Sequence, residues 1–227
     1  MLKLEDKIDR GDLHLRDTVI DGITAVGCGL SVHEEKRSTF DDCRFSKITA
    51  KKCVMGYPIF RRCTFNTVKS DFLGCYGTLF LECKLEGIID GVNFALTPIA
   101  RPISEKGRQR LTDANLSLAS EVKWSLDVRN AILAGAGFND EAIVPKVLFN
   151  RGQCLIYRGT DLQEKLIRAF KSVQDRGIQR ALVPPPNRKA TVHLVTLEAE
   201  GAMDRIEEIK QIVLESGLEV IEEPLCG

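Results

Sequence analysis

The sequence predicts a β-solenoid followed by an α+β region. Between Leu15 and about Ala95, every fifth residue is apolar or small almost throughout. The same chemistry returns every twenty residues, so that residues 40–59, 60–79 and 80–99 align without a gap. Beyond about residue 112 the pattern changes to helical spacing. A fixed repeat is typical of a solenoid, in which each unit buries its apolar face by stacking on its neighbours.

The repeat also predicts what fills the solenoid. A chain that returns to the same position every twenty residues climbs by one strand spacing, roughly 4.8 Å, per coil. Phe40, Phe60 and Phe80 should therefore form one interior stack. Five of the eight cysteines share a second slot, and we interpret them as small buried hydrophobes in a reducing compartment rather than as disulfide or metal sites. These are Cys28, Cys43, Cys53, Cys63 and Cys83.

The pentads CRFSK, CTFNT and CKLEG resemble the pentapeptide-repeat family, whose pattern places a small residue two positions before a central Leu or Phe. The resemblance covers about residues 13–96 and implies a short right-handed β-helix of square cross-section, with four pentads per coil. We expect residues 1–100 to form this β-helix, with LEDKIDRGDL as a short polar cap at its N-terminal end.

The same resemblance suggests one function, because some members of the family imitate duplex DNA and protect topoisomerases. That imitation requires a long and strongly acidic rod. Residues 40–99 carry eight basic and six acidic groups. The charge therefore argues against a DNA mimic.

One pentad interrupts the pattern with charged residues where Leu or Phe is expected. It consists of His33, Glu34, Glu35, Lys36 and Arg37. We expect it to bulge outward as a loop at one edge of the β-helix. Solenoids tolerate such insertions, and exposed loops often carry binding residues. The pentad is therefore either a neutral insertion or the site at which a protein partner binds.

Residues 101–150 are predicted to form a helical connector that caps the last coil. Apolar residues at helical spacing predict a helix that begins at Thr112 or Asp113 and ends at Gly135 and Gly137. Its apolar stripe would consist of Leu116, Ala119, Val122, Leu126 and Leu133.

Residues 151–227 show the order strand, helix, strand, strand, helix, strand, which predicts a ferredoxin-like domain. The strands are expected at 153–158, 178–183, 190–200 and 218–223, with helices starting at Asp161 and at about Ala202. Asp161 and Glu164 resemble a capping box. A doubly wound α/β arrangement is the alternative, because short strand–helix units fit both folds.

The chemistry of the sequence favours binding over catalysis. It contains no nucleotide-binding, zinc-protease or nucleophile-elbow motif, so we predict no catalytic residues, metal ion or cofactor. We expect a cytoplasmic protein without a membrane segment that acts as an adaptor for a protein partner, with a homodimer formed through the C-terminal domain as an option. An active site formed between domains stays open.

Nucleic-acid binding is the second hypothesis. Residues 101–189 carry sixteen basic and nine acidic groups, whereas residues 190–227 carry two and nine. The two segments could neutralise each other on folding, or the basic one could face phosphates. The candidate phosphate contacts are Lys165, Arg168, Lys171, Arg176, Arg180, Arg188 and Lys189. Only Tyr157 offers an aromatic ring for base stacking.

Overall fold

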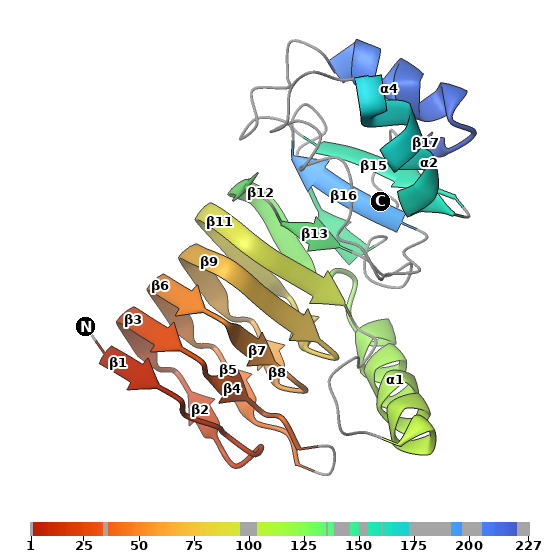
Figure 1. Cartoon of the computed structure of the whole chain (residues 1–227). Coiled ribbons are helices and arrows are strands. Elements are labelled where there is room, and N and C mark those ends of the chain that lie inside the picture. Colours follow the sequence, from red (N-terminus) through yellow and green to blue (C-terminus); the bar gives the residue numbers. More distant parts are fainter. Residues whose placement is uncertain are drawn as a thin grey trace.

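Strands dominate the structure, a computed structural model that describes residues 2–33, 36–95, 104–134, 136–138, 146–149, 154–159, 161–172, 192–196 and 206–221. Successive coils stack from the N-terminus upward (Figure 1). One wall is a four-stranded sheet in the order β10-β8-β5-β2. Its strands are β2 (His14–Arg16), β5 (Thr39–Asp41), β8 (Ile59–Arg61) and β10 (Leu79–Leu81).

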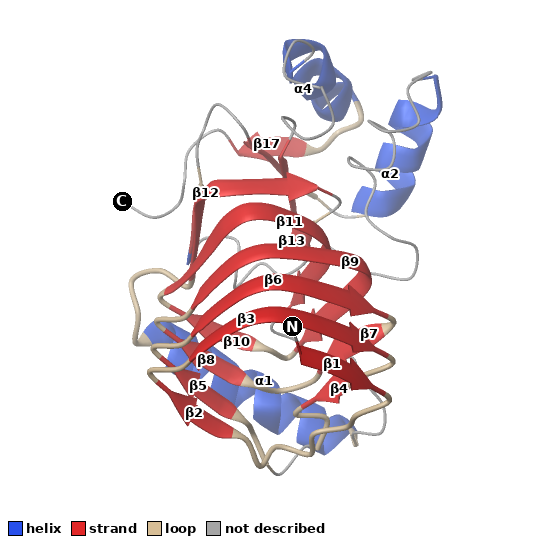
Figure 2. Cartoon of the chain, turned by 90° about the vertical axis from the view of Figure 1, so that its left-hand side faces the viewer, coloured by secondary structure: helices blue, strands red, loops and turns tan. Residues whose placement is uncertain are grey.

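The remaining walls belong to a 13-stranded sheet that bends around the core (Figure 2). Its solenoid strands are β1 (Leu2–Glu5), β3 (Val19–Val26), β4 (Gly29–Leu30), β6 (Arg44–Lys51), β7 (Cys53–Met55), β9 (Thr64–Tyr76), β11 (Cys83–Ala95), β12 (Leu126–Ala134), β13 (Gly137–Phe138) and β14 (Val147–Leu148). These strands pair in parallel, as the predicted β-helix requires.

The twenty-residue repeat is confirmed by strand register. Phe40 pairs with Phe60, and Phe60 with Phe80, in the four-stranded sheet. Their rings stack with centroids 4.7 and 5.4 Å apart. A second stack places Phe45 over Phe65 at 5.0 Å, and the two stacks meet edge to face. Like side chains therefore lie above one another through the core.

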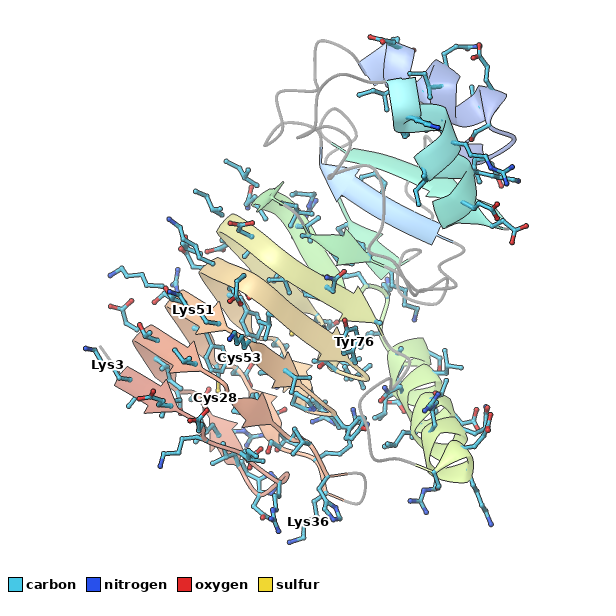
Figure 3. All side chains as sticks on the ribbon, in the orientation of Figure 1. Lys3, Cys28, Lys36, Lys51, Cys53 and Tyr76 are labelled. Atoms are coloured by element: carbon cyan, nitrogen blue, oxygen red, sulfur yellow. The ribbon has the colours of Figure 1, made fainter. Side chains whose placement is uncertain are left out.

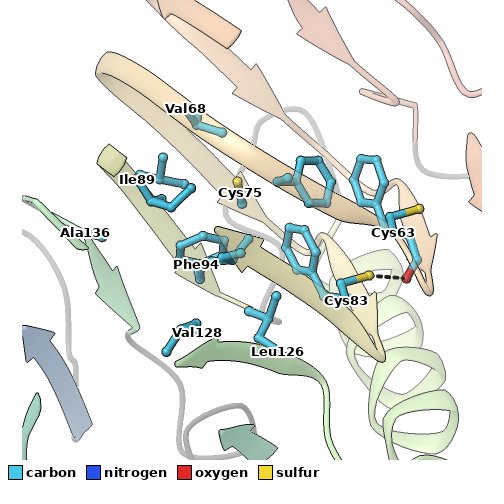
Figure 4. Close-up of a cluster of buried hydrophobic side chains, with 14 of the residues drawn as sticks. Cys63, Val68, Cys75, Cys83, Ile89, Phe94, Leu126, Val128 and Ala136 are labelled. Carbon is cyan, nitrogen blue, oxygen red and sulfur yellow. Dashed lines mark hydrogen bonds between the residues drawn. The ribbon is translucent and has the colours of Figure 1, made fainter. Parts of the chain in front are cut away.

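The predicted cysteine stack is also present (Figure 4). The Cys63 thiol donates to the carbonyl of Phe40, and the Cys83 thiol donates to the carbonyl of Phe60, both at 3.3 Å. The six cysteines described are free thiols. Burial raises the pKa of Cys75 to about 12, so that this thiol stays protonated at neutral pH. The stacked cysteines Cys63 and Cys83 fill the interior between coils.

The chain turns each corner with a residue in the left-handed conformation. Asp42, Arg62 and Glu82 occupy the same corner of successive coils, with φ between 51° and 56°. This conformation is unfavourable for residues with a Cβ atom. It persists because it directs the next residue inward, where Cys43, for example, is 2% exposed.

The connector differs from the prediction. The helix α1 runs from Glu105 to Ser120, and its N-cap is Ser104, whose hydroxyl accepts from the amide of Gly107 at 3.0 Å. The prediction of a start at Thr112 or Asp113 is therefore wrong. Lys146 donates to the carbonyls of Ala119 and Val122, which satisfies acceptors at the end of the helix.

The position of α1 also differs from a cap on the last coil. The helix contacts β10 and lies along the four-stranded sheet (Figures 1 and 2). Alternation along the strand points Leu79 outward, opposite to Phe80, yet Leu79 is 0% exposed. The helix thus covers a side of the solenoid.

The second half of the predicted helix is a strand, which is a further correction. β12 pairs in parallel with β11, and β14 pairs with β12, so that the solenoid continues past residue 100. Leu126 and Val128 are buried, and Ala131 and Leu133 are buried after a register shift. That bulge interrupts the alternation and makes the apolar spacing look helical. The expected domain boundaries at 100 and 150 stay predictions.

The C-terminal elements partly match the predicted order. They are β15 (Cys154–Arg158), α2 (Leu162–Ala169), the 3-10 turn η2 (Phe170–Ser172), β16 (Val192–Thr196), α4 (Ile206–Glu215) and β17 (Glu219–Ile221). β15 pairs antiparallel with both β16 and β17, which argues against a parallel doubly wound sheet. The strand predicted at 178–183 lies outside the described residues. β13 pairs antiparallel with the edge of β16. A ferredoxin-like sheet would place the strand predicted at 178–183 at this edge.

The two C-terminal helices bury the faces that their spacing predicts. Leu166 and Phe170 of the first, and Ile209 and Val213 of the second, are at most 1% exposed. The capping box at Asp161 is wrong, because this residue adopts φ 55° and its side chain makes no capping hydrogen bond.

Candidate functional site

The interrupted pentad is an insertion at one corner of the solenoid. Leu15 pairs with Phe40, and Leu30 with Met55, both 25 residues apart, whereas Phe40 pairs with Phe60 twenty residues on. The backbone carbonyl of Ser31 accepts from the amide of Tyr57, and the carbonyl of Ser38 accepts from the amide of Ile59. Six residues separate Ser31 from Ser38 where one separates Tyr57 from Ile59, so the five extra residues lie here. We call residues 32–37 the corner loop.

Asp9 anchors the base of the corner loop. One carboxylate oxygen accepts from the amide of Ser31 at 2.9 Å and from the hydroxyl of Ser38 at 2.6 Å. The other accepts from the amides of Gly11 and Asp12 at 3.2 and 3.3 Å. Burial alone would raise the pKa of Asp9, but these hydrogen bonds together outweigh it and lower the pKa. The carboxylate therefore joins both ends of the insertion to the N-terminal segment.

Gly11 allows the N-terminal segment to pass beside the loop. It adopts φ 103°, and a Cβ atom placed on it would lie 2.1 Å from the carbonyl oxygen of Lys36. Only glycine fits this conformation and this contact.

Arg37 anchors the other side of the loop. Its guanidinium donates to the carbonyls of Tyr57 and Gly77 and, at 2.8 Å, to Oδ1 of Asn115 on α1. Asn115 is itself 0% exposed and donates to the carbonyl of Gly77. One side chain thus joins the loop, the corners of two further coils and the helix. Burial, together with the nearby charge of Arg61, lowers the pKa of Arg37 to about 10.

The candidate partner-binding residues therefore divide into two groups. His33 and Lys36 are exposed, and Lys36 extends from the lower end of the molecule (Figure 3). The Lys36 ammonium pairs with Asp12 at 2.9 Å, and this hydrogen bond raises the pKa of Lys36. Arg37 differs from the expected outward orientation, because its guanidinium is used within the chain. Glu34 and Glu35 lie outside the described residues.

The outer walls carry mutually paired charges. Arg62 binds both carboxylate oxygens of Asp42 at 2.7 Å, which lowers the pKa of Asp42. The same pattern recurs on neighbouring coils and on β12. The pairs are Lys47 with Asp21, Arg61 with Asp41, Arg44 with Glu86, and Arg129 with Asp127. In these pairs each acidic side chain lies within 4 Å of a basic one.

Of the candidate phosphate contacts, three lie in the described residues. Lys165 and Arg168 lie on α2, and Lys171 follows in η2. Lys165 donates to the carbonyl of Gly217 at 3.2 Å, and Arg168 pairs with Glu164. Two of the three cationic groups therefore have partners within the chain. Arg176, Arg180, Arg188 and Lys189 lie outside the described residues.

The described ranges offer neither a metal site nor a membrane-spanning helix. In these, no three His, Cys, Asp or Glu side chains gather in a way that could hold a metal ion. Every helix in these ranges is too short or too polar to cross a bilayer.

Sequence reasoning missed Asp9, Ser38 and Asn115. Asp9 lies outside the apolar pattern, and its 29-residue separation from Ser38 follows from the insertion rather than from the repeat. Asn115 had a detectable signal, since it interrupts an i, i+4 series of small or apolar residues at Leu111 and Ala119. A polar residue in such a series predicts a buried hydrogen bond.

The β-helix is shown by the strand register of this chain, and similarity to known proteins adds little. No family model and no curated protein sequence matches the chain. Among solved structures, a chain described as QnrB1, "a plasmid-mediated fluoroquinolone resistance protein", is similar with a TM-score of 0.28 and 12% identity. The match covers 66% of this chain and 78% of that chain. A TM-score this low carries no inference about function.

The Asp9→Asn variant tests the anchor at the base of the loop. Asparagine retains the shape but loses the charge, so we expect a loss of about 1–3 kcal/mol in the free energy of unfolding at pH 7. Because the folded pKa of Asp9 is lowered, its contribution is complete above about pH 4 and disappears as the pH falls through the folded pKa. The difference between wild type and variant should therefore shrink below pH 4 in chemical denaturation.

Asp12→Asn is the matched control, since the exposed pair of Asp12 with Lys36 should contribute less than about 1 kcal/mol. Equal losses in the two variants, or a difference for Asp9→Asn that is constant from pH 7 to pH 2.5, would contradict the anchor.

Arg37→Lys tests the second anchor. Lysine keeps the positive charge but lacks the planar fork that reaches Tyr57, Gly77 and Asn115 together. We expect amide hydrogen exchange within α1 to accelerate about tenfold, which corresponds to about 1.4 kcal/mol in opening free energy. Lys36→Ala is the control and should leave α1 unchanged. Unaltered protection of α1 in Arg37→Lys would show that the contact does not hold the helix.

Proposed function

We propose that the chain is a pentapeptide-repeat-type β-helix that acts as an interaction or adaptor protein and binds a protein partner through the corner loop. The observation that carries the proposal is that this loop is fixed at both ends while His33 and Lys36 stay exposed. Asp9 and Arg37 hold its two ends before any partner arrives. A loop held at both ends loses less conformational entropy on binding than a free one.

The packed interior of the solenoid leaves its outer surface as the place where a partner can bind. Phe60, Cys63 and Cys83 are at most 1% exposed, and their neighbours fill the coils around them (Figure 4). A core of packed rings and thiols offers few polar groups to orient a small molecule. The walls and loops are therefore the surfaces that could recognise a macromolecule.

The paired charges of the walls argue against the DNA-mimic alternative. A surface that imitates duplex DNA needs carboxylates whose negative charge is free. Asp42, Asp21 and Asp41 each have a basic partner within 4 Å. Such a wall suits a partner with charges of both signs.

For residues 151–227 we keep the ferredoxin-like arrangement as a proposal. The order β16-β15-β17, with antiparallel pairing, matches the third, first and fourth strands of that fold. β13 pairs with the edge of β16 at which the second strand of that fold would lie, and this counts against such a strand. The sheet of the C-terminal unit would then continue the sheet of the solenoid.

The test of the proposed function is affinity capture with a variant that changes the loop tip and leaves Arg37 intact. His33, Glu34, Glu35 and Lys36 are replaced by Ala in the full chain. We expect recovery of at least one protein partner from cell lysate to fall about tenfold or more, because exposed anchor residues often contribute over 1 kcal/mol to binding. Lys123→Ala, at an exposed residue outside the walls and the corner loop, is the control.

Unchanged recovery of all partners by the loop variant would contradict the proposal. The lysate is also treated with nuclease. If capture depends on nucleic acid and is abolished by Ala at Lys165, Arg168 and Lys171, the nucleic-acid hypothesis replaces it.

A further inference from the structure

The N-terminal end of the solenoid leaves two strand edges open. Among the described residues, β1 pairs with β3 alone and β2 pairs with β5 alone. Backbone groups along the free edges are available to a further strand. The first two residues of the predicted polar cap, Leu4 and Glu5, belong to strand β1.

Apolar side chains gather at the same end. Leu2, Ile8, Leu13 and Val19 are 51%, 65%, 44% and 72% exposed. All four belong to the first coil, whereas the described part of the upper coils exposes two paired isoleucines, Ile88 and Ile132, and otherwise none of its large apolar residues on the strands. Several large apolar side chains exposed on one coil are more than scattered single residues would give, and such exposure is typical of an interaction site.

The core itself is open at this end. Leu15 and Ile20 are partly buried, although Phe40 and Phe45, one coil above in the same stacks, are 3% and 6% exposed. The stacking that buries Phe40 and Phe45 therefore leaves the corresponding residues of the first coil partly exposed. A solenoid needs a cover here.

The charges on β1 indicate which cover fits. Lys3 and Glu5 flank Leu4 and are both exposed. If two copies of β1 pair antiparallel about a two-fold axis with Leu4 opposite Leu4, each Lys3 faces a Glu5 of the other copy. Opposite charges directly across an antiparallel pair stabilise it, whereas like charges destabilise it. The edge is thus complementary to itself, as a two-fold interface requires.

We propose that the N-terminal end of the solenoid is a homodimer interface, in which β1 pairs antiparallel with β1 of a second copy and the rim of Leu2, Ile8, Leu13 and Val19 is buried. The end opposite to the C-terminal helices then provides self-association, and the outer walls stay open to a partner. This goes beyond the proposed function and does not depend on it.

The test is sedimentation velocity of the full chain over a range of concentrations. We expect a dimer in the wild type. Lys3→Glu places two Glu–Glu pairs at the interface, and Glu5→Lys places two Lys–Lys pairs, so each should weaken dimerisation about tenfold or more. An equimolar mixture of the two variants restores both opposite-charge pairs and should recover the dimer. Circular dichroism verifies that the exposed substitutions leave the fold intact.

Lys123→Glu, on an exposed residue after α1, is the control and should dimerise like the wild type. A wild type that stays monomeric up to about 100 μM would overturn the proposal, with the interface weaker than about 5.5 kcal/mol. A dimer that neither variant weakens, or weakened variants that the mixture does not rescue, would also overturn it, because the register of the edge would then be different.

Discussion

Stacking of parallel coils in register is the constraint on which the rest of this structure depends. Each coil must close after the same number of residues, or the chain would place a polar residue above an apolar one. Phe60 lies over Phe40 because twenty residues separate them, and the Cys83 thiol donates to the carbonyl of Phe60 in the coil below. The left-handed residues at the corners are one consequence, since the chain must change direction at fixed intervals regardless of residue type.

The constraint also determines where extra residues can lie. Five of them are accommodated between Ser31 and Ser38, at a corner, where they leave the pairing of the walls unchanged above and below. The insertion brings polar backbone into a partly buried corner, and those groups need partners. Asp9 accepts from the amide of Ser31 at one end of the insertion, and Arg37 at the other end donates to the carbonyl of Tyr57. These contacts hold the two ends of the loop, and this links the packing of the solenoid to its proposed binding surface.

The sequence predicts the repeated part of the fold well and the unique contacts poorly. Phe stacks, the cysteine slot and the inserted pentad follow from spacing, because a repeat is read many times along the chain. The predicted helix joins the end of α1 to β12, because a bulge in β12 interrupts the alternation between Val128 and Ala131. Asp9 and Asn115 could not be located from spacing, because their partners are distant in sequence and each contact occurs once. Arg37 was identified as part of the interrupted pentad, but its inward orientation depends on the position of α1.

The position of the insertion can be measured directly by nuclear Overhauser contacts between backbone protons in neighbouring strands. Thr49 lies between Thr24 on one side, 25 residues away, and Lys69 on the other, twenty residues away. The account predicts cross-strand contacts for Thr49 with both of these residues. Contacts of Thr24 with Arg44 instead would show a uniform twenty-residue coil, and would contradict a five-residue insertion at the corner loop.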